Sequence, residues 1–162
     1  MREPADLPGP LILDSSVLVA YERVRAPRGD LREAQSLVAE WISAEVPLVV
    51  PTLSLLVAAH ECQGELPEVD YLLASGPPAV VVVPLTRQSA PAVGAAAAKT
   101  HPDALEIAQV VWCATGNDPT GPALAVVTYW PDWYTGAGCR SSRCSTGGAV
   151  SGSGVRGSWR AG

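Results

Sequence analysis

The chain has 162 residues, 48% of them hydrophobic and 17% charged, which fits one domain with a core and excludes two large domains, a disordered acidic solubiliser and a polybasic nucleic-acid tail. The net charge is −5, yet all 16 acidic residues lie at or before Asp132, and four of the 11 basic residues lie in 138–162. Residues 1–137 therefore carry a net charge of −9, which repels nucleic acid unless a cation lies between the two.

The composition also bears on where the protein works. No segment approaches the roughly 18 uncharged apolar residues that a membrane span needs, and residues 1–10 lack the basic and apolar regions of a secretory signal. Cys62 and Cys113 lie in apolar, helix-like stretches, while Cys139 and Cys144 have no second pair with metal-ligand spacing nearby. We therefore expect a cytoplasmic protein with reduced thiols and no membrane partner.

The first half of the chain alternates apolar runs with helical patterns. Residues 10–14 form an apolar run that ends in a carboxylate, which is typical of a buried strand with Asp14 at its carboxyl end. Ser15 or Ser16 then caps a helix predicted to end near residue 25. The pattern next predicts a helix over 30–44, a strand over 47–50, a helix from residue 51 and a short helix ending near residue 74.

The second half continues this alternation and then loses it. Residues 79–85 include four consecutive valines, which predict a third strand that is too apolar to be exposed. Helices over 88–100 and 102–115, a loop over 116–122 and a strand over 123–128 follow. After Tyr134 the chain is rich in Gly, Ser and Arg and has no periodicity, so we predict one domain over 1–134 and a disordered tail over 135–162.

The order of these elements predicts an α/β fold. Strands that are apolar throughout and alternate with helices indicate a parallel sheet covered on both faces, which is a three-layer α/β/α sandwich. Such sheets bind ligands outside the carboxyl ends of their strands, where the strand order reverses. The residues to inspect for chemistry are therefore Asp14, Pro51, Pro84 and Thr128.

Two acidic residues are candidates for a functional site in this fold. In a helix from residue 102, Asp103 lies on the same face as Ile107 and Val110, so its carboxylate is directed inward or, alternatively, only complements the helix dipole. Asp14 either caps the first helix or, since Ser15 or Ser16 can cap alone, is a charge that needs a partner at the end of a buried strand. Two adjoining carboxylates would repel each other unless a cation lay between them, and oxygen ligands favour Mg²⁺ or Mn²⁺.

Four segments of the sequence, in this order, resemble the PIN domain, the fold of many VapC-type toxin ribonucleases. They are Leu-Ile-Leu-Asp-Ser-Ser-Val-Leu-Val-Ala-Tyr at 11–21, Leu-Val-Val-Pro at 48–51, His-Pro-Asp-Ala-Leu-Glu-Ile-Ala at 101–108 and Ala-Val-Val-Thr-Tyr at 125–129. The resemblance spans residues 11 to about 134. It implies an endoribonuclease that depends on Mg²⁺ or Mn²⁺, an RNA substrate, an antitoxin partner and a homodimer.

The resemblance also assigns residues, with departures. The family's first acid falls on Asp14, accompanied by the Ser16 hydroxyl, and its third acid falls on Asp103. The place of the second acid holds Val57, so Glu61, one turn later, is either a substitute ligand or a partly solvated surface acid. The family's fifth strand is not visible in the sequence, which predicts a truncated sheet.

The segment after the fourth predicted strand departs as well. Two residues beyond Thr128, where the family often has another acid, this chain has Trp130, and the nearest acid is Asp132. The aromatic side chains of Trp130, Trp133 and Tyr134 either stack on bases of single-stranded RNA or close an edge of the domain.

Two functions follow from these observations. The first is a metal-dependent ribonuclease with Asp14 and Asp103 as metal ligands. In it, Glu61 and Asp132 are the third and fourth acids, and Ser16 or Thr128 orients water or metal. The alternative is a PIN-derived binding or regulatory module that keeps the fold without a complete metal site, which Val57 and Trp130 favour.

Overall fold

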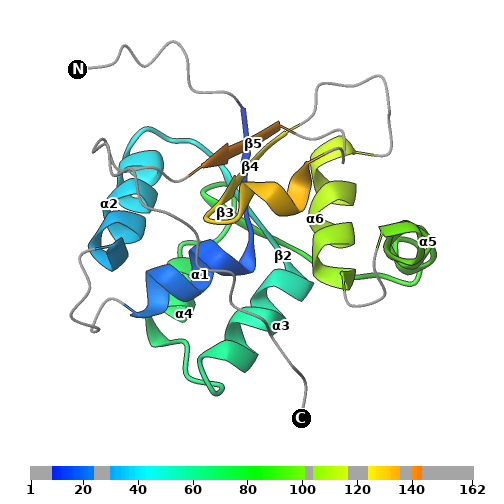
Figure 1. Cartoon of the computed structure of the whole chain (residues 1–162). Coiled ribbons are helices and arrows are strands. Elements are labelled where there is room, and N and C mark those ends of the chain that lie inside the picture. Colours follow the sequence, from blue (N-terminus) through cyan, green and yellow to red (C-terminus); the bar gives the residue numbers. More distant parts are fainter. Residues whose placement is uncertain (1–8, 24–29, 101–103, 117–123, 136–139, 144–162) are drawn as a thin grey trace.

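The fold is built on a parallel sheet with the strand order β3-β2-β1-β4-β5 (Figure 1). The computed structural model describes residues 9–23, 30–100, 104–116, 124–135 and 140–143. The strands are β1 (Leu11–Leu13), β2 (Leu48–Pro51), β3 (Val80–Val83), β4 (Ala125–Thr128) and β5 (Arg140–Arg143). The first four lie where the apolar runs predict them.

The helices also follow the predicted order. They are α1 (Ser15–Glu22), α2 (Asp30–Ser43), α3 (Thr52–Glu61), α4 (Pro67–Leu73), α5 (Ala90–Thr100) and α6 (Leu105–Thr115), with a 3₁₀ helix η3 (Pro131–Tyr134) after β4. Pro67 opens α4, as suits a residue without a backbone N–H at the first turn of a helix. Among the described residues, no helix is both long and apolar enough to cross a bilayer.

Successive strand residues bury opposite faces of the sheet, and this alternation creates the layers. Leu11 and Leu13 of β1 pack with residues of α1, α2, α3 and α4, whereas Ile12 packs with Val110 of α6 and Tyr134 of η3. Helix α5 adds to the second layer by packing on α6 (Figure 1). The three-layer α/β/α prediction is therefore confirmed.

The two edges of the sheet correct the sequence expectations. Strand β3 is an edge strand of the described sheet and pairs there with β2, so Val82 is 40% exposed although the run of valines predicted burial. The prediction of a truncated sheet is wrong, because β5 pairs in parallel with β4 inside the segment that we predicted to be disordered. The hydrogen bonds between paired strands come from the backbone, so polar residues can form an edge strand without an apolar run in the sequence. Residues 136–139 and 144–162 of the predicted tail lie outside the described residues.

The strand order fixes where a ligand site belongs. From β1 the chain proceeds through β2 to β3 on one side, and β4 and β5 lie on the other side of β1. The order thus reverses between β1 and β4, and parallel sheets bind ligands outside the carboxyl ends of the strands at such a point. The residues at these two ends are Asp14 and Thr128.

Candidate functional site

Asp14 follows β1 directly and is completely buried. It is the N-cap of α1, since its Oδ1 accepts a hydrogen bond from the Val17 amide at 3.3 Å. The same oxygen accepts the Ser16 hydroxyl, and Oδ2 accepts the Tyr134 hydroxyl at 3.0 Å. These contacts hold the carboxylate in one orientation at the switch point.

Ser16 and Thr128 connect the carboxyl end of β1 to that of β4. Their hydroxyl oxygens are 3.5 Å apart, and both residues are buried. The Tyr129 amide donates to Ser16 Oγ at 2.9 Å, and the Trp130 amide donates to Thr128 Oγ1 at 2.9 Å. The structure thus brings together three residues that the sequence singled out, Asp14, Ser16 and Thr128.

Glu106 of α6 is the second acid at this position, and sequence reasoning missed it. It is 8% exposed, and its Oε1 accepts a hydrogen bond from the Ser15 amide at 2.9 Å. Ser15 is the residue after Asp14, so both carboxylates meet the start of α1, where the helix dipole favours negative charge. The described residues therefore contain a pair of buried acids from distant parts of the chain.

Burial dominates the electrostatics of this pair. It raises the pKa of Asp14, while the hydroxyls of Ser16, Thr128 and Tyr134 and the Val17 amide lower it. Burial also raises the pKa of Glu106, the charge on Asp14 raises it further, and contacts with Ser15 and Ser54 lower it. A nearby cation would offset both desolvation and mutual repulsion.

A second polar side chain on α6 lies one turn beyond Glu106. The fully buried Gln109 accepts the Leu53 amide of α3 at 2.7 Å and donates to the Val83 carbonyl of β3 at 3.2 Å. Next to Leu53, Ser54 is fully buried, and its hydroxyl makes no hydrogen bond of standard geometry to the part of the chain that is described. Glu106 and Gln109, three residues apart in an otherwise apolar helix, were the available sequence signal for this polar face.

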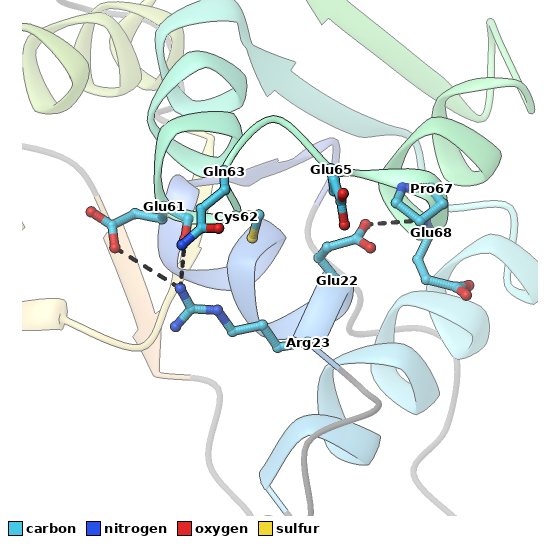
Figure 2. A pocket seen from close by; sticks show the side chains of 8 residues that line it. All are labelled: Glu22, Arg23, Glu61, Cys62, Gln63, Glu65, Pro67 and Glu68. Atoms are coloured by element: carbon cyan, nitrogen blue, oxygen red, sulfur yellow. Dashed lines mark hydrogen bonds and ion pairs between the residues drawn. The ribbon is translucent and has the colours of Figure 1, made fainter.

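Glu61 lies away from the pair, so the structure does not support it as a substitute ligand. Its carboxylate is 4.0 Å from the Arg23 guanidinium, and the Arg23 Nη2 also donates to the Glu61 carbonyl at 2.8 Å (Figure 2). Arg23 is the C-cap of α1 and Asp14 is its N-cap, which separates them by about 13 Å along the axis. Glu61 instead lines an open groove of about 390 Å³ with Glu22, Cys62 and Glu68, among others.

The other two acids that the sequence predicts for the site are Asp132 and Asp103. Asp132 lies in η3 with an exposed side chain, and it is Tyr134, also in η3, that donates to Asp14. Asp103 lies outside the described residues, which stop at Thr100 and resume at Ala104. Its role as a ligand therefore stays a prediction.

The aromatic residues after β4 divide between the two alternatives that the sequence left open. Tyr134 is 2% exposed and closes the core against Ile12 and Val126, as a domain-edge residue would. Trp130 and Trp133 are 48% and 47% exposed, and their ring centroids are 4.5 Å apart at an interplanar angle of 40°. The two indoles thus form a tilted pair on the surface.

The donor set suits a hard divalent ion. Asp14 and Glu106 offer only oxygen, as do the nearby Ser54 and Thr128 hydroxyls, and oxygen ligands favour Mg²⁺ or Mn²⁺. Within the described ranges, no group of three or more His, Cys, Asp or Glu residues is arranged so that it could hold a metal ion. Mg²⁺ sites commonly use one or two carboxylates together with water and substrate phosphate, so two buried acids fit the group.

Comparison with known proteins supports the fold. No protein-family model matches the chain, and no curated protein matches it. Among solved structures, it is similar to a chain in the crystal structure of DNA-bound VapBC from Salmonella typhimurium, with a TM-score of 0.51 and 15% identity over 85% of this chain and 99% of that chain. The element order, the parallel sheet and this likeness together show that the fold is PIN-like.

Proposed function

We propose that this protein is a divalent-metal-dependent endoribonuclease of the PIN type that hydrolyses RNA phosphodiesters. The observation that carries the proposal is the pair of buried carboxylates, Asp14 and Glu106, at the switch point of the sheet. Ligands bind at this position in open parallel sheets, and a buried pair of acids calls for a cation. The cation also lets a strongly acidic protein approach a polyanion.

Each residue of the site has a role in this proposal. Asp14 and Glu106 would hold the metal ion, with Asp103 as the further ligand that the sequence resemblance implies. The Ser16 and Tyr134 hydroxyls and the Val17 amide fix the Asp14 carboxylate, and the Ser15 amide fixes that of Glu106. When bound, the ion neutralises phosphate charge and lowers the pKa of a coordinated water.

The proposal includes a place in a toxin-antitoxin pair. Its support is the structural likeness to a chain of a VapBC complex over nearly the whole length of that chain. An antitoxin protein and a second copy of this chain are therefore the partners to test first.

A second function has its own support. Asp14 is fully buried, and each of its contacts also serves the fold, because the carboxylate caps α1 and ties η3 to β1. Val57 of α3 offers no carboxylate where the family resemblance places one. These observations favour a PIN-derived binding or regulatory module without a complete metal site.

Cleavage of labelled single-stranded RNA of mixed sequence separates the two functions. We expect cleavage with Mg²⁺ or Mn²⁺, none with a chelator, and a loss of at least about 10²-fold for Asp14→Asn and Glu106→Gln. Glu61→Gln is the matched control, because Glu61 is an exposed acid that lies beside Arg23 at the C-terminal end of α1. This variant should cleave RNA like the parent. Cleavage that survives both Asp14→Asn and Glu106→Gln, or no cleavage with either metal, would refute the nuclease and leave the binding module.

A further inference from the structure

The exposed pair Trp130 and Trp133 has no role in the fold comparable with that of Tyr134. About half of each indole is in contact with solvent, and the two rings contact each other. Large aromatic surfaces are costly to leave in water, and adjacent exposed apolar groups mark binding sites more often than isolated ones do. The pair therefore calls for a ligand that has flat apolar faces.

Hydrogen bonds tie this pair to the candidate site on both sides. The Trp130 amide donates to Thr128 Oγ1 at 2.9 Å, at the carboxyl end of β4. The Trp133 amide donates to the Trp130 carbonyl at 3.1 Å. The next residue, Tyr134, donates to Asp14 Oδ2. The backbone that carries the two indoles is thus attached to the candidate site through Thr128 and Tyr134.

The sequence of β5 differs in charge from the acidic part of the chain that precedes it. Strand β5 contacts η3 and lies beside β4 (Figure 1), and the pairing register sets Arg140 opposite Ala125 and Arg143 opposite Thr128. The sequence has no acidic residue after Asp132. The pairing thus puts two basic positions on the strand next to β4, whereas the groove at the other end of α1 is lined by four glutamates.

We propose that Trp130 and Trp133 form a base-stacking subsite that binds unpaired nucleobases of the RNA strand next to the phosphodiester at Asp14 and Glu106. This inference rests on the proposed function for the position of the scissile phosphate. Stacking on an aromatic side chain tolerates any base, because every base has a π face, and each stack changes affinity by about 5-fold to 150-fold. The subsite selects single-stranded over paired nucleic acid.

Binding of a fluorescently labelled single-stranded RNA in chelator at low ionic strength tests the subsite without cleavage. The parent should bind this RNA and bind an abasic strand of equal length more weakly. The Trp130→Ala/Trp133→Ala double variant should lose at least about 5-fold in affinity for the base-containing strand and little for the abasic one. The Trp130→Phe/Trp133→Phe variant keeps aromatic faces and should retain most of the affinity, which separates stacking from a loss of folding. Tyr71→Ala is the matched control, because Tyr71 is 77% exposed on α4 and should bind like the parent.

The outcomes separate this inference from the proposed function. Equal affinity of the parent for both strands, no binding by the parent, or unchanged affinity in the double alanine variant would overturn the subsite even if the parent cleaves RNA with metal. A protein partner that shields both indoles while RNA does not would also overturn it. Base-dependent binding that needs both indoles, in a chain that never cleaves, supports the subsite and counts against the nuclease.

Discussion

The hydrogen bond from Tyr134 to Asp14 should contribute measurably to stability, and Tyr134→Phe isolates it. The substitution removes one hydroxyl and keeps the ring that packs against Ile12 and Val126, so no large cavity forms. Donor and acceptor are both buried, and the atoms are 3.0 Å apart. A hydrogen bond to a charged group contributes about 1.5–3 kcal/mol, which corresponds to a decrease in Tm of about 3–12 °C for a chain of this size.

The pH dependence of this loss has a definite sign. The Tyr134 hydroxyl lowers the pKa of Asp14 against the dominant effect of burial, which raises it, so the hydrogen bond favours the ionised carboxylate. Its contribution to the free energy of unfolding is therefore present above the folded-state pKa of Asp14 and decreases as the pH falls through it. Tyr134→Phe should destabilise the chain more at neutral pH than at acidic pH.

Chemical denaturation of the metal-free chain at both pH values measures this effect. Tyr71→Phe removes the same hydroxyl from an exposed position and should stay within about 0.5 kcal/mol of the parent. If Tyr134→Phe is as stable as this control at neutral pH, or if its loss of stability grows as the pH falls, the hydrogen bond does not stabilise the ionised carboxylate.

Two further predictions concern α6. Gln109→Leu leaves the Leu53 amide without its acceptor, while the Val83 carbonyl keeps its hydrogen bond from the Thr52 hydroxyl. Chemical denaturation should therefore show a free energy of unfolding lower by about 1–3 kcal/mol, and almost no change for the control Gln88→Leu at an exposed position. Equal stability of the two variants would contradict this prediction. Burial raises the pKa of the Cys113 thiol from 9.0 to about 11. At a pH well below both values, Cys113 should therefore form about 100-fold less thiolate than an ordinary thiol, and it should react with iodoacetamide more slowly by the same factor. Site-resolved mass spectrometry of alkylation near neutral pH checks this, and a rate equal to that of a free cysteine derivative would count against it.

Much of the fold follows from local sequence, and the exceptions have physical causes. Strands β1 and β4 are buried on both faces and β2 is buried except at the partly exposed Val49, so their apolar runs are unambiguous. Strand β5, Arg-Ser-Ser-Arg, is held through backbone pairing with β4 at an edge, which leaves no hydrophobic signal to read. Val82 is exposed because β3 lies at the opposite edge of the sheet, and no local sequence pattern distinguishes a central strand from an edge strand.

The site was predictable where a residue ends a strand or, like Ser16, lies just beyond one. Asp14 and Thr128 follow from their positions after apolar runs. Glu106 lies within an apolar helix, and its contact with Ser15 joins residues 91 positions apart, which no local pattern specifies. For Glu61 the sequence leaves a substitute ligand and a partly solvated surface acid open, and the structure places it beside Arg23, at the end of α1 opposite Asp14.

In the proposed function, the carboxylates of Asp14 and Glu106 bind one divalent cation together. Calorimetric titration of the purified chain with Mn²⁺ tests it most directly, alongside Asp14→Asn, Glu106→Gln and the control Glu61→Gln. We predict saturable heat in the parent and in Glu61→Gln, and its loss in the other two variants. No metal-dependent heat in the parent, or the same heat in all four proteins, would contradict the account.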